Sequence, residues 1–556
     1  MNTSGATLPV RRGMWLLCLA VLGCSQTPPP GGRPSKDETV AAAGARPVPQ
    51  AAATKGMREQ LLAGMVAILS ELERYDEVRA AEQVFDRLVQ WSHAAREGAW
   101  QPDPLLGTLT SPLRESAAAV LERPTFDGSG DIQAVRDRIW LAAIVRTAGG
   151  DGLDEVEAAT RLFAWTIRWL AAVSDPPMVP TEAVPGSRWF FPGEILLAGR
   201  GSPAQRAWIF LELLNQAGID GVMLATPGPA GGPPRPWVPA AIIGGEAYLF
   251  EPTYGQPIAG PDGDGIATVR QAAADPGILA ALSLPDRPYP VQANDLGRLV
   301  VLVPGDAWSL SARMARLNAE LAPAHGVRVA VEASTLAARA LAAIPGANEG
   351  EPQLWTFPWE TLARRELAGA ALADEIGPLT VPLPSDDPRQ SGQAVRPLFA
   401  GRVREFRGEL EGPAGAKAAY LAARPSRRAI SQAVAGLPEP QAAAVTRGLV
   451  RMKEDATYWL GLLTLSEGQD QAAADYLGRM TLEAAPDSRW TDAARVNLAA
   501  ALEGLGRLQE AAVALEADGS PQRFGSRLRA AKLLAKAATM QPEAPPPAAL
   551  SEPAED

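Results

Sequence analysis

The sequence RPWVPAAIIGGEAYLFEPTYG, residues 235–255, decides the fold of the central part of the chain. Two short apolar runs flank Gly244-Gly245, a dipeptide that suits a two-residue hairpin loop. Pro236 and Pro239 cannot donate hydrogen bonds to a neighbouring strand, so we expect them at the beginning of an edge strand. The stretch therefore predicts a β-hairpin.

A helix and a short strand are predicted just before this hairpin. The helix covers residues 203–217, has an apolar interior and is ended by Gly218. The apolar run at residues 221–225 reads as a buried strand. A helix, a strand and a hairpin in this order predict an α+β arrangement. Residues 299–303 and 327–331 read as two strands around a helix at residues 309–321, which together predict a small α/β unit of their own.

As a set, residues 155–257 resemble the transglutaminase-like core, which has a papain-like fold. In that family a Gly-x-Cys opens a helix, a His-x-Trp lies on a following strand, and an Asp-Pro-Thr or Asp-Pro-Ser lies on the next one. The matching tripeptides here are Gly201-Ser202-Pro203, Arg235-Pro236-Trp237 and Glu251-Pro252-Thr253. The resemblance therefore places Pro203, Arg235 and Glu251 where the family has its catalytic Cys, His and Asp.

These replacements remove the chemistry that the resemblance implies. Acyl transfer needs an activated nucleophile and a base that is poised near neutral pH. Pro203 offers no nucleophile, and Arg235 stays protonated at any ordinary pH and cannot serve as a base. We expect no catalytic residue at these positions and expect Glu251 to form a structural ion pair with Arg235.

Ser202 keeps an alternative open, because its hydroxyl lies beside the vacated cysteine position. A serine nucleophile needs a base, and the two histidines, His93 and His325, both lie outside residues 155–257. A serine followed by proline is also the usual beginning of a helix, with the serine as N-cap. We expect the capping role.

Aromatic side chains are the candidates for binding. Trp189, Phe190 and Phe191 form an aromatic run in a loop, and Trp237 lies in the hairpin. They either line a binding groove or pack under the loop. The acidic stretches 127–131 and 262–265 lack the glutamate and glycine positions of a calcium loop and are expected to be turns. We expect no metal and no cofactor.

The N-terminus reads as a targeting signal. Arg11 and Arg12 precede a short apolar run that ends in Val21-Leu22-Gly23-Cys24, which resembles a bacterial lipobox with Cys24 as the lipidated residue. The only other cysteine, Cys18, precedes Cys24 and is removed with the signal, so the mature body has no thiol. We expect a lipid anchor in the bacterial cell envelope, at the outer membrane and facing the periplasm, because Ser25 is not the Asp that retains lipoproteins at the inner membrane.

Residues beyond 400 read as almost entirely helical. Leu460-Gly461, Ala473 and Leu477 recur as Leu498-Ala499, Ala511 and Leu515, with an offset of 38 residues. Small residues where helices cross, with larger ones between them, resemble tetratricopeptide (TPR) repeats. An ordinary helical bundle is the alternative.

The predicted organisation is mixed α+β and follows the order of the chain. The segments are a signal peptide (1–23), a disordered tether (24–56), a helical region (57–150), a transglutaminase-like domain (151–285), a small α/β unit (286–375), a linker (376–395), an all-α TPR-like domain (396–540) and a disordered tail (541–556).

The sequence favours a membrane-anchored protein- or peptide-binding module, a pseudoenzyme that binds its partner through the TPR-like region. An amide hydrolase or acyl transferase with an unusual nucleophile is the alternative. The formal net charge of −11 does not indicate a positively charged surface of the kind that binds nucleic acid.

Overall fold

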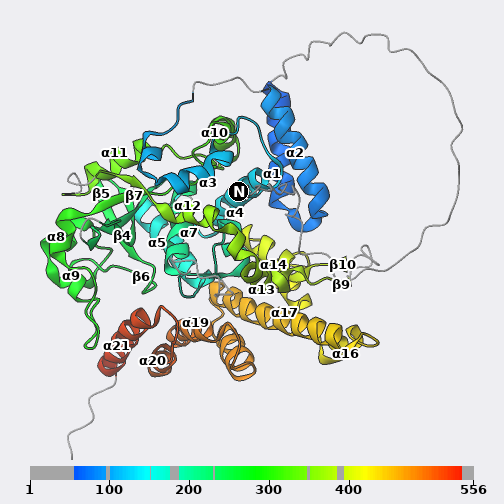
Figure 1. Cartoon of the computed structure of the whole chain (residues 1–556). Coiled ribbons are helices and arrows are strands. Elements are labelled where there is room, and N and C mark those ends of the chain that lie inside the picture. The colour runs from blue at the N-terminus through cyan, green and yellow to red at the C-terminus, as the bar shows by residue number, and fades with distance from the viewer. Residues whose placement is uncertain are drawn as a thin grey trace, which may run out of the picture.

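The computed structural model describes residues 55–94, 100–150, 152–175, 187–229, 232–346, 351–384 and 394–540. Within these ranges the chain is a mixed α+β structure, as predicted, with helices arranged around one six-stranded sheet (Figure 1). The predicted signal peptide with Cys24, almost all of the tether and the predicted tail lie outside the described residues.

The six-stranded sheet has the order β6-β5-β4-β3-β7-β8. Its strands are β3 (Asp220–Thr226), β4 (Arg235–Ile243), β5 (Glu246–Glu251), β6 (Gln256–Pro257), β7 (Val300–Val303) and β8 (Gln353–Leu354). Neighbours are antiparallel except for β7 and β8, which are parallel. Outside this sheet, two short pairs join β1 (Ala171–Ala172) to β2 (Arg200–Gly201) and β9 (Leu383–Pro384) to β10 (Ala394–Val395).

Both faces of this sheet are buried, which explains the continuous apolar run at residues 221–225. Side chains alternate along a strand, so Met223 faces one apolar core and Val222 and Leu224 face another. The Met223 face packs on helix α7 (Pro203–Ala217), whose Leu214 belongs to the same core. The short helices α8 (Val269–Ala274) and α9 (Pro276–Ala280) contribute to the core on the opposite face.

The predicted hairpin is present and is formed by β4 and β5. Gly244 and Gly245 both have positive φ angles, 57° and 80°, which only a two-residue loop rich in glycine adopts without strain. The prediction of an edge strand for Pro236 and Pro239 was wrong, because β4 lies between β3 and β5. Its ladder with β5 begins only at Ala240, so the residues before it pair with β3 alone and both prolines are tolerated there.

The chain before the sheet is helical. Its longer helices are α1 (Lys55–Ser70), α2 (Glu77–Ala94), α3 (Ser111–Leu121), α4 (Gly128–Thr147) and α5 (Glu155–Trp169). The acidic stretch at residues 127–131 was expected to be a turn, but it begins α4, and Asp131 forms a buried ion pair with Arg313. The second acidic stretch is a turn, as predicted, with Asp262 at a φ of 59°.

Residues 286–375 do not form a separate α/β unit. Strand β7 pairs with β3 and so belongs to the sheet of the hairpin. It is followed by α10 (Ala312–His325), α11 (Ala333–Ala343), α12 (Thr356–Ala363) and α13 (Gly369–Thr380). The strand predicted at residues 327–331 is absent, because its backbone groups bond to side chains and not to a neighbouring strand. The Gln216 side chain bonds both the N–H and the carbonyl oxygen of Arg328, and the Asn318 side chain accepts the backbone N–H of Val329.

The remainder is helical, as predicted, and reaches back to the sheet. Its helices are α14 (Pro397–Phe406), α15 (Ala416–Ala422), α16 (Arg427–Ala433), α17 (Glu439–Ser466), α18 (Asp470–Ala474), the π-helix η9 (Asp475–Glu483), α19 (Thr491–Gly504), α20 (Leu508–Glu516) and α21 (Arg523–Met540). Figure 1 shows α17 as the long helix from which α19, α20 and α21 follow along the lower edge of the molecule.

Candidate functional site

The N-terminus of α7 is a closed helix cap. The Ser202 hydroxyl accepts the backbone N–H of Gln205 at 3.3 Å, and the Gln205 side chain accepts the backbone N–H of Ser202 at 3.1 Å. Pro203 takes the first helical position, where a missing N–H costs nothing. The capping role predicted for Ser202 is confirmed, and Ser202 is fully buried.

Neither histidine serves Ser202 as a base in this structure. His93 lies at the end of α2 and His325 at the end of α10. Within the part of the chain that the structure describes, the hydrogen bonds of Ser202 go to Gln205, and none joins it to an imidazole. The arrangement therefore lacks the hydroxyl–imidazole pair that a serine nucleophile needs.

The predicted ion pair between Arg235 and Glu251 was wrong. Arg235 is exposed at the beginning of β4, whereas Glu251 is buried at the end of β5. The two strands pair Ala240 with Leu249, and this register, continued, sets Val238 opposite Glu251. Arg235 thus lies three residues beyond that position, in solvent, and the described residues include no ionic partner for it.

Glu251 instead accepts hydrogen bonds from a tyrosine and from the backbone. The Tyr289 hydroxyl donates to one carboxylate oxygen, and the backbone N–H of Thr253 donates to the other at 2.8 Å. Trp237 donates its indole N–H to the Tyr289 oxygen at 2.8 Å. Burial raises the pKa of Glu251, and these hydrogen bonds oppose the shift. Trp237 and Glu251, two of the predicted site residues, are therefore joined through Tyr289.

Arg206 fills the space between the cap of α7 and the end of β5. Its guanidinium is buried and donates to the carbonyl oxygen of Leu170 at 2.8 Å, to that of Pro252 at 3.2 Å and to the side-chain oxygen of Gln522 at 2.7 Å. All three acceptors are neutral, and burial lowers the pKa of Arg206 to about 10. The contact with Pro252 brings the first turn of α7 beside the Glu251-Pro252-Thr253 segment.

The beginning of α21 covers the end of the hairpin. Phe524 lies 6.2 Å from the ring of Tyr254, and the Arg287 guanidinium stacks on Phe524 at 3.7 Å. Gly525 approaches so closely that an added Cβ would lie 1.9 Å from the Tyr254 carbonyl oxygen. The end of the hairpin, where the resemblance would place the Asp of an active site, is thus packed against α21.

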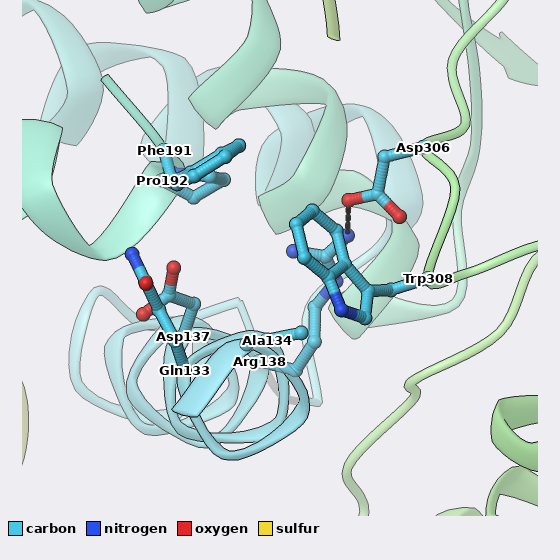
Figure 2. Close-up of a pocket in the computed structure, with 9 residues that line it drawn as sticks. Gln133, Ala134, Asp137, Arg138, Phe191, Pro192, Asp306 and Trp308 are labelled. Carbon is cyan, nitrogen blue, oxygen red and sulfur yellow. Dashed lines mark hydrogen bonds and ion pairs between the residues drawn. The ribbon is translucent and has the colours of Figure 1, made fainter. Parts of the chain in front are cut away.

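The aromatic run at residues 189–191 packs in the core and does not line a groove. Trp189 and Phe190 are fully buried, and Phe191 is 8% exposed. They precede a short helix, α6 (Pro192–Ala198), within a stretch expected to be loop. Figure 2 shows Phe191 at a recess of only about 10 Å³, near Trp308 and the Arg138–Asp306 ion pair, whose nitrogen and oxygen lie 2.9 Å apart.

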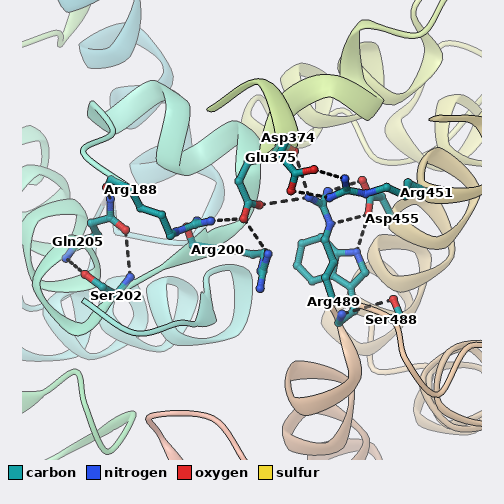
Figure 3. A network of polar contacts seen from close by, with 11 residues as sticks. Arg188, Arg200, Ser202, Gln205, Asp374, Glu375, Arg451, Asp455, Ser488 and Arg489 are labelled. Carbon is teal, nitrogen blue, oxygen red and sulfur yellow. Dashed lines mark hydrogen bonds and ion pairs between the residues drawn. The ribbon is translucent and has the colours of Figure 1, made fainter. Parts of the chain in front are cut away.

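A buried charge network joins the sheet region to the C-terminal helices (Figure 3). Glu375 of α13 pairs with Arg188, with Arg200 at 2.8 Å and with Arg489 at 3.1 Å. Arg489 pairs in turn with Asp455 of α17. Burial alone would raise the pKa of Glu375, but the three guanidinium groups outweigh burial and lower it. The network therefore links Arg188 and Arg200, beside the sheet, to α13 and to the C-terminal helices.

Sequence reasoning missed Tyr289, Arg206 and Gln522, the three side chains that occupy this region. Tyr289 lies 38 residues from Glu251, and Gln522 lies 316 residues from Arg206, so no local pattern connects them. The only local signal was an arginine on the otherwise apolar face of a predicted helix, three positions after Pro203.

Comparisons with known proteins do not identify a family. No protein-family model matches the chain, and no curated protein or solved structure matches it. Across the described ranges, no helix is both long and apolar enough to cross a bilayer.

Proposed function

We propose that this chain is a lipid-anchored envelope protein that binds or scaffolds other proteins, with a transglutaminase-like domain that has lost its catalytic residues and a TPR-like helical region. The observation that supports the proposal best is what stands at the three positions where the transglutaminase-like family has its catalytic Cys, His and Asp. Pro203 takes the first position of a helix that Ser202 caps, Arg235 is exposed without an ionic partner among the described residues, and Glu251 is hydrogen-bonded to Tyr289.

Among the described residues, the three family positions do not bring together a nucleophile and a general base for acyl transfer. A guanidinium cannot accept a proton at ordinary pH. Glu251 is held by a phenol and a backbone N–H and does not face an imidazole. The scaffold nevertheless stays packed, because the strands of the hairpin contribute to the apolar cores on both faces of the sheet. Retention of the hairpin is therefore explained by packing alone.

The helical region supports a binding role. Helix α17 packs on η9, and α19 packs on α20, so that the second pair repeats the first along the chain. At the first crossing an added Cβ on Gly461 would lie 2.8 Å from Leu477, which explains the small residue there. In the second copy Ala499 and Ala511 are fully buried. Stacked helix pairs of this kind present extended surfaces to peptides and partner proteins.

Site-specific photo-crosslinking in the intact envelope tests this proposal. A photoreactive amino acid replaces Val513 of α20, which is 66% exposed, and a matched control replaces Val78 of α2, which is 45% exposed. We expect a discrete cross-linked partner from position 513 and none from position 78. Palmitate labelling that disappears in Cys24→Ser tests the anchor. Equal patterns from both positions would contradict the binding role.

A further inference from the structure

A groove runs between α5 and the helices that follow the sheet. It has a volume of about 610 Å³ and is lined by residues of four segments: the end of α4, α5, the end of α14 with the loop after it, and the end of α17. This volume lies within the roughly 300–1,000 Å³ that is usual for ligand pockets. The side chains that line the groove therefore decide which ligand it fits.

One face of α5 supplies the aromatic wall of the groove. Arg161, Ala164, Trp165 and Arg168 follow each other at the spacing of residues on a single helix face. The ring of Trp165 stacks on that of Trp169, with centroids 6.3 Å apart and an angle of 28° between the rings. Neither indole N–H donates to a protein acceptor in the described part of the chain. Trp165 is half-buried and faces the groove, whereas Trp169 is only 5% exposed and supports the Trp165 ring from the core.

Arg168 is the charged side chain of this groove that lacks a partner. Arg161 pairs with Glu157 at 2.6 Å, Arg407 with Glu73 at 2.7 Å, and Glu405 with Arg402 at 2.8 Å. For Arg168, the residues described by the structure provide no hydrogen-bond acceptor and no carboxylate.

The surroundings of Arg168 favour the binding of an anion beside its guanidinium. The side chain is half-buried, and burial, together with the nearby charge of Arg529, lowers its pKa. Arg529 has its own partner, Glu503, at 2.6 Å. The wall around the two tryptophans therefore carries an uncompensated positive charge, and a carboxylate is the group that would complete it.

The other lining groups argue against a sugar. A carbohydrate needs a hydrogen-bond partner for most of its hydroxyls, yet the neutral hydrogen-bonding side chains apart from the indoles are Thr147 and Ser466. The charged groups Glu405 and Arg407 are already paired. Tryptophan and arginine are the residues most enriched where proteins bind one another tightly. The groove is suited to apolar rings and one carboxylate.

We propose that this groove is a docking site for an acidic peptide segment of a partner protein. A carboxylate side chain of that segment pairs with Arg168, and a neighbouring proline or aromatic ring packs on Trp165, whose ring Trp169 holds in place. The proposal rests on the binding role proposed above and names the chemistry of one partner.

The test uses the full chain in detergent and a phage-displayed library of random dodecapeptides. Enriched peptides are resynthesised with a fluorescent label, and their affinities are measured for the wild type, Arg168→Gln, Trp165→Ala and the control Arg428→Gln. Arg428 is an exposed arginine on α16 and is not among the residues that line the groove. Thermal melts of all four proteins accompany the binding curves.

We expect the enriched peptides to be acidic and to carry proline or aromatic residues beside the carboxylates. Arg168→Gln and Trp165→Ala should each weaken binding by about 10-fold, the loss of one charge pair or one aromatic contact. Arg428→Gln should bind as the wild type does. Arg168→Gln should also melt no earlier than the wild type, because the arginine has no internal partner to lose.

Other outcomes would overturn the proposal. These are enriched peptides without acidic residues, affinities unchanged by Arg168→Gln, or competition by oligogalacturonate, which would mark the groove as a site for acidic sugars. A partner cross-linked at position 513 together with any of these results would refute the groove proposal and leave the binding role standing.

Discussion

Arg206, in the first turn of α7, donates a hydrogen bond of 2.7 Å to the side chain of Gln522, which is 316 residues away and immediately precedes α21. The bond is buried and bridges the sheet region of the chain and the C-terminal helices. It lies beside Pro252, at the position where the resemblance would put an active-site cleft. The C-terminal region is therefore part of the same folded body as the hairpin.

Replacing Arg206 should weaken the contact between α7 and the segment before α21. Arg206→Met leaves the carbonyls of Leu170 and Pro252 and the Gln522 side chain without their donor, and each buried unsatisfied acceptor costs about 1–3 kcal/mol. We expect the free energy of unfolding to fall by about 3 kcal/mol, measured by urea denaturation. Gln522→Ala removes one of the three contacts and should cost about 1–2 kcal/mol. Equal stability of Arg206→Met and the wild type would contradict this role.

Glu251 and Arg235 should respond differently to substitution, because they do not form a pair. Glu251→Ala leaves the Tyr289 hydroxyl and the Thr253 N–H without their acceptor and should destabilise the fold by about 2–3 kcal/mol. Arg235→Ala should change stability by less than about 0.5 kcal/mol, as is usual for a surface position. Thermal denaturation of both variants and the double variant measures this, and coupling between the two sites would restore the ion-pair hypothesis.

Acid should weaken the network around Glu375. Its pKa is lower in the fold than in the unfolded chain, so its contribution to stability is present above the ordinary glutamate pKa of about 4.3 and is lost as the pH falls through the lowered value. Glu375→Gln should cost about 3 kcal/mol near neutral pH. The difference in unfolding free energy between wild type and variant should shrink as the pH falls below about 4.3. A difference that does not change with pH would exclude this contribution.

Gly525 should not accept a side chain. An added Cβ would lie 1.9 Å from the Tyr254 carbonyl oxygen, a backbone atom that cannot move without shifting the hairpin end. Gly525→Ala should therefore destabilise the protein by about 2–3 kcal/mol and expose the segment before α21 to protease. Gly519→Ala is the matched control, since its nearest neighbour is the Asp492 side chain at 3.4 Å. Similar proteolysis of the two variants would argue against the close contact with Tyr254.

Local signals in the sequence predicted the local structure well. Ser202 with Pro203, and Gly218 at the other end, define α7 as predicted, and Gly218 takes the left-handed conformation that ends the helix. Gly244-Gly245 predicts the loop between β4 and β5. These features depend on a few neighbouring residues, whose backbone preferences and caps act without help from the rest of the chain.

Features that depend on distant residues were not predictable in this way. The run at residues 327–331 alternates like a strand, but Gln216 and Asn318 satisfy its backbone groups, so no strand forms. The partner of Glu251 is Tyr289 and not Arg235, because β4 extends beyond the end of β5 and carries Arg235 into solvent. Trp165 and Trp169 lie four residues apart on α5, and only the arrangement of four segments places them at a groove.

The proposed loss of catalysis is tested most directly by an acyl-transfer assay on the full chain, with a glutamine-containing protein as acyl donor and a labelled primary amine as acceptor. Wild type and Ser202→Ala are measured side by side, with an active transglutaminase as positive control. We expect no incorporation of the amine by either protein beyond the rate without enzyme. Incorporation by the wild type that disappears in Ser202→Ala would contradict the inactive scaffold.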